Sequence, residues 1–157
     1  MTDGASTVLL ASEAWAAARG LPVLAYLTFS EVAAVDFLDP AEGLLMAPVH
    51  AVPRLLSRAA VRLQDFDYYE IHEAFAAQVL CTLKAWEDDD YCRTRLGLPQ
   101  ALGSIDLGRL NVNGSSLATG HPFAATGARI VATLAKQLAQ AGRGRGDRKS
   151  TRLNSSH

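Results

Sequence analysis

The sequence predicts an α/β fold in which a mixed, mostly parallel sheet carries helices on both faces. Apolar, strand-like runs alternate with segments whose apolar residues recur at helical spacing, an order typical of β-α-β units with right-handed crossovers. With 157 residues and 49% hydrophobic composition, the chain can build one domain with a sizeable core. Because the last predicted helix has no strand signal after it, we expect the sheet to lack its closing strands.

The first elements are a strand, a helix and a second strand. The apolar run at residues 5–11 predicts the first strand, and Ser12 before an Ala-rich segment predicts a helix that ends at Gly20. Residues 21–35 are rich in Val, Leu, Phe and Thr, which favours a long second strand.

A second helix and a third strand follow. Apolar residues at helical spacing predict a helix over residues 49–60, with Pro48 and Pro53 in its first turn because proline is tolerated there. The apolar and aromatic run at residues 68–71 predicts the third strand.

The remaining chain is predicted to hold two helices separated by an irregular stretch. Residues 72–86 predict a helix, residues 87–110 a surface excursion with a short helix, and residues 111–120 a Gly/Ser/Asn loop. Pro122 suits the first position of a last helix that runs over residues 123–141 and ends at Gly142.

Charge and cysteine content exclude several classes of protein. The 15 basic and 16 acidic residues give a net charge of -1, so no general basic field indicates nucleic acid binding. The two cysteines, Cys81 and Cys92, are too few for a disulfide framework and lack C-x-x-C spacing. No apolar run approaches the roughly 20 residues of a membrane span, and the first residues lack signal-peptide character. We therefore expect a cytoplasmic protein with no nucleic acid partner and no membrane span.

The last residues differ in character from the rest. Residues 147–157 read DRKSTRLNSSH, a polar stretch without periodicity after a Gly/Arg-rich segment. The stretch also resembles the in-frame translation of a sequencing-library adaptor. We therefore expect a partial domain over residues 1–146, followed by a disordered, non-native tail over residues 147–157.

His121 is the strongest candidate for chemistry. It stands between a flexible loop and a helix, where a ligand can reach it. The positive end of the following helix disfavours a second proton, so the imidazole is expected to be neutral and usable as a base. A histidine that only hydrogen-bonds within the loop remains the alternative.

His72 is the second candidate, because it follows the third strand. Ligand sites of parallel sheets lie at the carboxyl ends of strands, so His72 is expected on the same rim as His121. A zinc metalloprotease is excluded because the HExxH motif needs a histidine where Ala76 stands. Ser115 and Ser116 lack the G-x-S-x-G context of a hydrolase and are expected to shape the loop. A helix-capping role for His72 stays open.

Two segments together resemble the thiolase family. Residues 70–78, EIHEAFAAQ, are similar to one motif of its C-terminal half, and residues 111–127, NVNGSSLATGHPFAATG, resemble its signature around the catalytic histidine. The resemblance implies that residues 1–146 form most of a thiolase C-terminal half, with an incomplete thiolase-like fold. Most thiolases have asparagine where His72 stands; the histidine is similar to fatty-oxidation thiolases and trifunctional-enzyme β-subunits.

The resemblance also implies an activity. Thiolases transfer acyl groups through a cysteine thiolate, using 3-ketoacyl-CoA and CoA as substrates and no cofactor or metal. His121 is carried over as the activating base, and His72 as a donor that completes an oxyanion site. The carried-over substrate-binding residues are Phe75, Gly120, Pro122 and Phe123.

The same resemblance implies what is missing. Cys81 and Cys92 match neither of the family's cysteine motifs, so we expect a fragment of an enzyme of fatty acid β-oxidation that is inactive alone. Its partners would be the N-terminal thiolase half and, for the parent, further copies of itself or a β-oxidation partner. The alternatives are a non-catalytic module that binds acyl-CoA or pairs with a subunit, and a fragment of a biosynthetic acetoacetyl-CoA thiolase.

Overall fold

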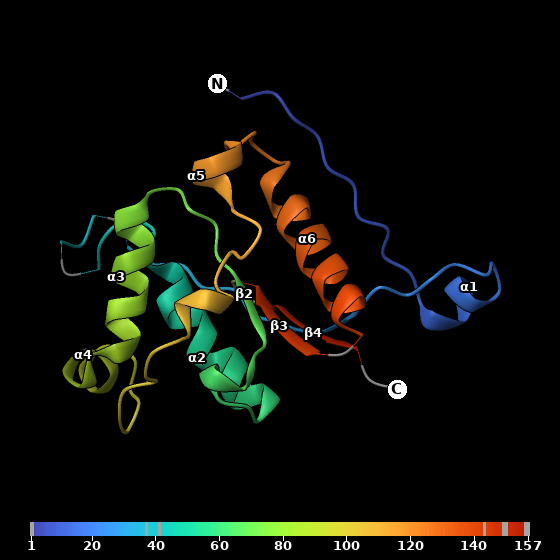
Figure 1. The fold of residues 1–157 in the computed structure, drawn as a ribbon. Coiled ribbons are helices and arrows are strands. Elements are labelled where there is room, and N and C mark those ends of the chain that lie inside the picture. The colour runs from blue at the N-terminus through green and yellow to red at the C-terminus, as the bar shows by residue number, and fades with distance from the viewer. Residues whose placement is uncertain (1, 37, 41, 143, 149–150, 156–157) are drawn as a thin grey trace.

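The computed structural model describes residues 2–36, 38–40, 42–142, 144–148 and 151–155 (Figure 1). Ten helices and strands organise this part of the chain, together with short 3-10 turns at Leu63–Asp65 and Leu107–Arg109. In chain order they are α1 (Glu13–Ala17), β1 (Tyr26–Ser30), α2 (Ala47–Ala59), β2 (Tyr68–Glu70), α3 (Ala76–Glu87), α4 (Asp89–Thr94), α5 (Ser116–Thr119), α6 (Thr126–Ala141), β3 (Gly144–Arg148) and β4 (Thr151–Ser155).

The described strands form one mixed sheet in the order β1-β4-β3-β2. Strand β2 pairs with β3 in parallel, whereas β4 is antiparallel to both β1 and β3. The α/β class is confirmed, but parallel pairing takes a smaller share of the sheet than the alternating element order suggests. The reason is that β3 and β4 lie next to each other between β1 and β2.

The sequence gives no strand signal after residue 146, yet β4 comes from that part of the chain. Its backbone pairs Tyr26 with Asn154 and Ser30 with Thr151. The described residues beyond 146 thus lie in strands, and the disorder expected for residues 147–157 as a whole stays a prediction. Backbone donors and acceptors are the same in every sequence, so an open strand edge can pair with a polar segment. The non-native origin of residues 147–157 stays a prediction.

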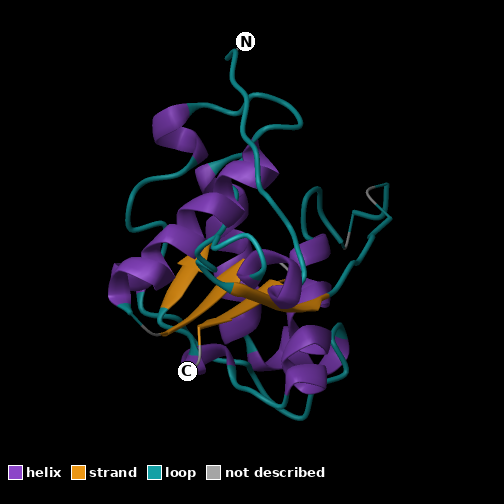
Figure 2. Cartoon of the chain, turned by 90° about the vertical axis from the view of Figure 1, so that its right-hand side faces the viewer, coloured by secondary structure: helices purple, strands orange, loops and turns teal. Residues whose placement is uncertain are grey.

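Helices cover both faces of the sheet, as the alternation along β2 shows. Tyr68 packs against Leu134 and Leu138 of α6. Its neighbour Tyr69 belongs to the larger cluster that α2 and α3 supply. Successive side chains of a strand point to opposite faces, so α6 lies on one face and α2 with α3 on the other. Figure 2 shows the strands between these helical layers.

Helix α2 contains a proline beyond its first turn. Pro48 stands at the start as expected, but Pro53 lies inside the helix and does not mark its beginning. Proline has no N–H, so the Val49 carbonyl four residues earlier loses its helical donor. The indole N–H of buried Trp86, on α3, donates to this carbonyl at 3.4 Å. The Val49 carbonyl that Pro53 leaves without a donor is thus satisfied by a side chain of the neighbouring helix α3.

This contact gives a testable stability prediction. Trp86→Phe is expected to lower the free energy of unfolding by about 1 kcal/mol, because the Val49 carbonyl loses its donor in a buried place. In a Pro53→Ala background the new backbone N–H can serve Val49, so the same Trp86 change should cost measurably less. Urea unfolding of the four variants measures the difference. An equal cost in both backgrounds would contradict the role given to the indole.

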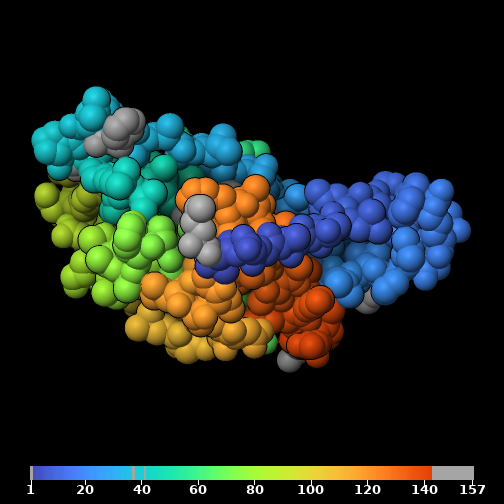
Figure 3. All heavy atoms as spheres, turned by 90° about the horizontal axis from the view of Figure 1, so that it is seen from above, coloured from blue at the N-terminus to red at the C-terminus, as the bar shows by residue number. Residues whose placement is uncertain are grey.

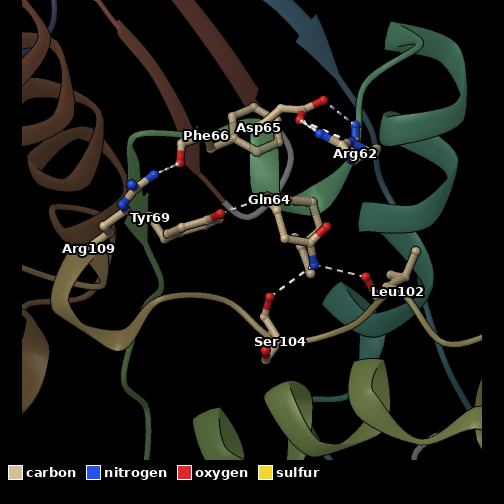
Figure 4. A network of polar contacts seen from close by, with 9 residues as sticks. Arg62, Gln64, Asp65, Phe66, Tyr69, Leu102, Ser104 and Arg109 are labelled. Atoms are coloured by element: carbon tan, nitrogen blue, oxygen red, sulfur yellow. Dashed lines mark hydrogen bonds and ion pairs between the residues drawn. The ribbon is translucent and has the colours of Figure 1, made fainter.

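Residues 87–110 form a surface excursion with the short helix α4, in agreement with the sequence. The excursion is fastened to the turn before β2, as Figure 4 shows. The side-chain amide of Gln64 donates to the carbonyls of Leu102 and Ser104, each at 2.9 Å. Arg109 donates to the Phe66 carbonyl at 3.1 Å. Residues 102–109, the last part of the excursion, are therefore held against the turn that leads into β2 and on to His72.

Several predicted boundaries differ from the structure. The first strand is wrong: residues 5–11 are irregular and mostly exposed. The second strand keeps only the five residues of β1. The helix expected from residue 72 begins at Ala76, and the last helix begins at Thr126 because Ala124 has a positive φ of 68° that interrupts a helix.

The N-terminal segment lies across the turn that carries His121. The Ser6 hydroxyl donates to the Ala125 carbonyl, and Figure 3 shows the segment crossing this surface. Gly120, with φ of 85°, is the closest approach: a Cβ added there would lie 2.6 Å from the Thr2 hydroxyl oxygen. Conformation and space therefore both favour glycine at this position.

Candidate functional site

Two histidines meet at one edge of the molecule. His72 follows β2, and His121 follows the short helix α5. Their ring centroids are 4.1 Å apart, and the ring planes are inclined by 42°. His72 is half-buried and His121 is exposed, so solvent reaches the pair. The predicted proximity of the two rings agrees with the structure.

Asn111 joins the two segments that carry these rings. Its backbone N–H donates to the Tyr69 carbonyl at 2.8 Å. Its side-chain oxygen accepts from the Ile71 N–H at 2.9 Å, and its side-chain nitrogen donates to the Ile71 carbonyl at 3.0 Å. The amide of Asn111 thus extends the pairing of β2 by one residue, just before His72.

Glu73 makes a second link between the same segments. One carboxylate oxygen accepts from the Asn111 side chain at 2.9 Å, and the other from the backbone N–H of Leu117 at 3.0 Å. Leu117 lies in the first turn of α5, where backbone donors have no helical partner. Glu73 therefore fixes α5, and His121 behind it, to the loop that holds His72.

The Asn111 contacts predict a defined loss of stability. Its φ is 47°, a region that glycine also adopts, so Asn111→Gly removes the side-chain bonds without adding backbone strain. We expect the free energy of unfolding to fall by about 2 kcal/mol, because Ile71 loses both side-chain partners in a half-buried place. Urea unfolding measures this. Asn113→Gly, at an exposed position of the same loop, is the control; an equal effect of both changes would contradict the link.

Each histidine ring also contacts a hydroxyl group through Nδ1. His72 Nδ1 lies 2.8 Å from the Ser116 hydroxyl oxygen, and His121 Nδ1 lies 2.7 Å from that of Thr126. Arg129 of α6 donates to the hydroxyls of Ser115 and Ser116 at 3.2 and 3.4 Å. The helix-capping alternative for His72 is wrong, because Phe75 stands at the N-cap of α3.

One aromatic side chain lies against the pair, and a second stands close to it in the sequence. The Phe123 ring centroid is 5.0 Å from that of His121, and this side chain is 85% exposed. Phe75, three residues after His72, is 63% exposed. Gly120 and Pro122 are the backbone neighbours of His121 on either side. An exposed apolar surface next to polar rings suits a ligand with apolar and polar parts.

Glu70 lies just beneath the site. It is 1% exposed, and neither carboxylate oxygen has a hydrogen-bond partner among the described residues. Burial raises the pKa of Glu70 from 4.5 to about 7, although the positive charge of Arg129 lowers it; the negative charge of Glu73 adds to the rise. Period-two alternation places Glu70 on the face of Tyr68, toward α6, which is the signal that sequence reasoning could have used.

Sequence reasoning missed the residues that support the histidines. Asn111, Ser116 and Thr126 lie in segments that the sequence predicts only as loop or helix, and Arg129 lies in a helix for which the sequence predicts no functional role. The partners of Asn111 and Ser116 lie 40 and 44 positions away in the chain, so spacing does not reveal them. Thr126 stands only five residues after His121, and this short spacing is a signal that the sequence does display.

The two cysteines lie elsewhere. Cys92 is fully buried, and its thiol contacts the carbonyls of Ala85 and Trp86. Cys81 lines an open cavity of about 580 Å³ between α3 and residues 104–107, and neither histidine belongs to that lining. Within the described ranges, no three His, Cys, Asp or Glu side chains gather in a way that could hold a metal. None of the described helices has the length and hydropathy that crossing a bilayer requires.

Comparison with known proteins places this arrangement in a family. Residues 21–148 match the family model described as thiolase, C-terminal domain. A 3-ketoacyl-CoA thiolase of Yersinia pestis is 44% identical over 146 residues, which cover 93% of this chain and 33% of that protein. The chain thus spans about a third of the length of this curated relative.

Solved structures agree. Human mitochondrial 3-ketoacyl-CoA thiolase superposes with a TM-score of 0.66 at 27% identity, over 94% of this chain and 34% of that one. The acetyl-CoA acetyltransferase of Syntrophomonas wolfei also gives a TM-score of 0.66, at 28% identity, over 90% of this chain and 33% of that one. The family model matches most of the chain, and the Yersinia pestis protein is 44% identical over 93% of it. The chain therefore belongs to the thiolase family.

Proposed function

We propose that this chain supplies the histidine part of an acyl-transfer site that acts on 3-ketoacyl-CoA and CoA in fatty acid β-oxidation. The observation that carries the proposal is the solvent-accessible pair of rings at 4.1 Å, His72 and His121. The identity of 44% to a 3-ketoacyl-CoA thiolase favours the degradative reaction over a biosynthetic acetoacetyl-CoA thiolase.

In the proposed reaction a cysteine thiolate attacks the 3-keto carbonyl, the bond between C2 and C3 breaks, and acetyl-CoA leaves as its enolate, which takes a proton from an acid outside this chain. The thiol of CoA then loses its proton to a base and attacks the acyl-cysteine thioester, which releases the shortened acyl-CoA and restores the cysteine thiolate. His121 removes the proton that activates a thiol, which its exposed ring can do without obstruction. His72 donates a hydrogen bond to the enolate oxygen on which negative charge develops. Phe75, Phe123, Gly120 and Pro122 contact the acyl and pantetheine parts of the substrate.

The attacking cysteine is not one of the two in this chain, since Cys92 is buried and Cys81 lines a different cavity. We therefore propose that a cysteine-bearing thiolase half is the partner, that the assembled enzyme is oligomeric and cytoplasmic, and that this chain alone is inactive. CoA is a substrate here and no cofactor is required.

The test has two readouts. Incubated with acetoacetyl-CoA or a longer 3-ketoacyl-CoA plus CoA, the purified chain should form no acetyl-CoA in excess of a blank. Binding of CoA should nevertheless perturb the ring signals of His72 and His121 in NMR spectra. Robust turnover would overturn the assignment of the cysteine to a partner, and absence of any CoA contact with the rings would overturn the proposed function.

The apolar contacts give the binding prediction. Phe75→Ala is expected to weaken CoA binding about tenfold, because an aromatic contact is worth about 1 kcal/mol beyond its burial. Leu107→Ala is the matched control: this side chain is 64% exposed, against 63% for Phe75, but lies in the excursion after α4. An equal loss in both variants, in titrations followed by NMR, would contradict the placement of the substrate.

The non-catalytic alternative differs in one outcome. A module that only binds acyl-CoA would take up CoA as above, but would not support turnover when joined to a cysteine-bearing thiolase half.

A further inference from the structure

The Ser116 hydroxyl lies between a histidine and an arginine. Its oxygen is 2.8 Å from His72 Nδ1 and 3.4 Å from the Arg129 terminal nitrogen. Ser116 is buried and Arg129 is half-buried, so water has little access to these contacts. The three side chains come from α5, the loop after β2, and α6.

The protons in this arrangement can be counted. An arginine side chain carries donors and no acceptor, so Ser116 must accept from Arg129. The single hydroxyl proton of Ser116 then remains for another partner. His72 Nδ1 is the acceptor that the described residues place against it. A ring nitrogen that accepts carries no proton, and in a neutral imidazole the proton then sits on the other nitrogen.

The geometry points to Ser116 and Arg129 as positioning residues that fix the tautomer of His72, with the proton on Nε2. This inference rests on the proposed function for its chemical meaning, because a donor to the enolate oxygen must present an N–H and not a lone pair. With the other tautomer, the lone pair of Nε2 would repel the developing negative charge.

Ser115 provides an internal comparison. Its buried hydroxyl also accepts from Arg129, at 3.2 Å, but its own contact is to the Ile71 carbonyl at 3.4 Å and not to a histidine. Removing Ser115 therefore disturbs the same arginine and the same loop without touching the His72 ring. Any general effect of loop packing should appear in both serine variants.

The test reads the ring nitrogens directly. Long-range ¹H–¹⁵N spectra of the ¹⁵N-histidine-labelled full chain are recorded above about pH 8, where histidine rings are normally neutral. His72→Asn assigns the signals by their disappearance. We expect His72 to show protonated Nε2 and unprotonated Nδ1, with a ratio of about ten or more between the tautomers from one sheltered hydrogen bond.

The variants separate positioning from packing. Ser116→Ala should lower this ratio several-fold and Arg129→Met should lower it partly, whereas Ser116→Thr, which keeps the hydroxyl, and Ser115→Ala should retain it. A wild-type spectrum with the proton on Nδ1 overturns the inference without any variant, so the test remains decisive even if Ser116→Ala does not fold. An unchanged ratio in a folded Ser116→Ala overturns it as well.

The measurement needs neither CoA nor turnover. If the tautomer is as inferred but CoA does not bind near the rings, the proposed function fails and the positioning role stands. If CoA binds but the tautomer is mixed, the positioning role fails and the proposed function stands.

Discussion

In a chimera that carries residues 1–146 in place of the matching third of the Yersinia pestis 3-ketoacyl-CoA thiolase, His121→Ala is expected to lower kcat about a thousandfold. The relative is expected to supply the cysteines of the proposed reaction, while His72 and His121 come from this chain. The substitution removes the proposed base but leaves Thr126 and the start of α6 in place. Acetyl-CoA formation from a 3-ketoacyl-CoA measures kcat.

Variants at His72 test the second proposed role in the same chimera. His72→Ala is expected to lower kcat about a hundredfold, which is typical for one lost oxyanion donor. His72→Asn restores an N–H donor and should recover most of the activity, since asparagine stands there in most thiolases. An active His121→Ala chimera would contradict the base, and equal loss in the alanine and asparagine variants at His72 would contradict the donor role.

Glu70→Gln is expected to remove a pH dependence of stability that the wild-type chain shows between about pH 4.5 and 7. Burial raises the pKa of Glu70 from 4.5 to about 7, so the folded state holds its proton more tightly than the unfolded state. Stability is therefore highest below pH 4.5 as far as this group is concerned, falls as the pH rises, and reaches its full loss above about pH 7. The difference in pKa corresponds to about 3 kcal/mol.

Comparing unfolding free energies at several pH values isolates this contribution. Above about pH 7 the glutamine variant should be more stable than wild type by up to about 3 kcal/mol, and near pH 4.5 the two should be similar. Exposed Glu87→Gln is the control and should follow the wild-type curve. Parallel curves for wild type and Glu70→Gln would contradict the structure, which excludes the Glu70 carboxyl group from water.

Local signals in the sequence predicted local structure well. Ser12 caps α1 by accepting from the Trp15 N–H, and Gly142 ends α6 with a φ of 69°. Both depend on a few neighbouring residues, which a sequence displays directly. Pro122 was misleading, because it suggests a helix start next to it, whereas Ala124 at positive φ delays the start of α6 to Thr126.

The strands were predicted less well because a strand depends on its neighbour. Residues 5–11 have the composition of a strand, but the structure leaves them irregular and outside the sheet, with Ser6 bonded to the Ala125 carbonyl. Residues 151–155 have no such composition and form β4 between two other strands. Pairing of backbone groups between distant segments decides both cases.

For the candidate site, the topology rule placed His72 at the rim of the sheet from sequence alone, because this residue follows a strand. The structure brings His121, which follows the short helix α5, to the same place. Their supports could not be found in that way. Asn111 binds a residue 40 positions away, and Ser116 a ring 44 positions away. The burial of Glu70 likewise depends on α6, more than fifty residues later.

The proline inside α2 has a consequence for where His72 lies. A regular helix has no free carbonyl in its interior, so a neighbouring helix is normally placed along it by the packing of side chains alone. Pro53 leaves one carbonyl open, and Trp86 reaches it only at one axial setting of α3. Since α3 begins four residues after His72, this pairing in the core also holds the far end of the short loop that carries the imidazole.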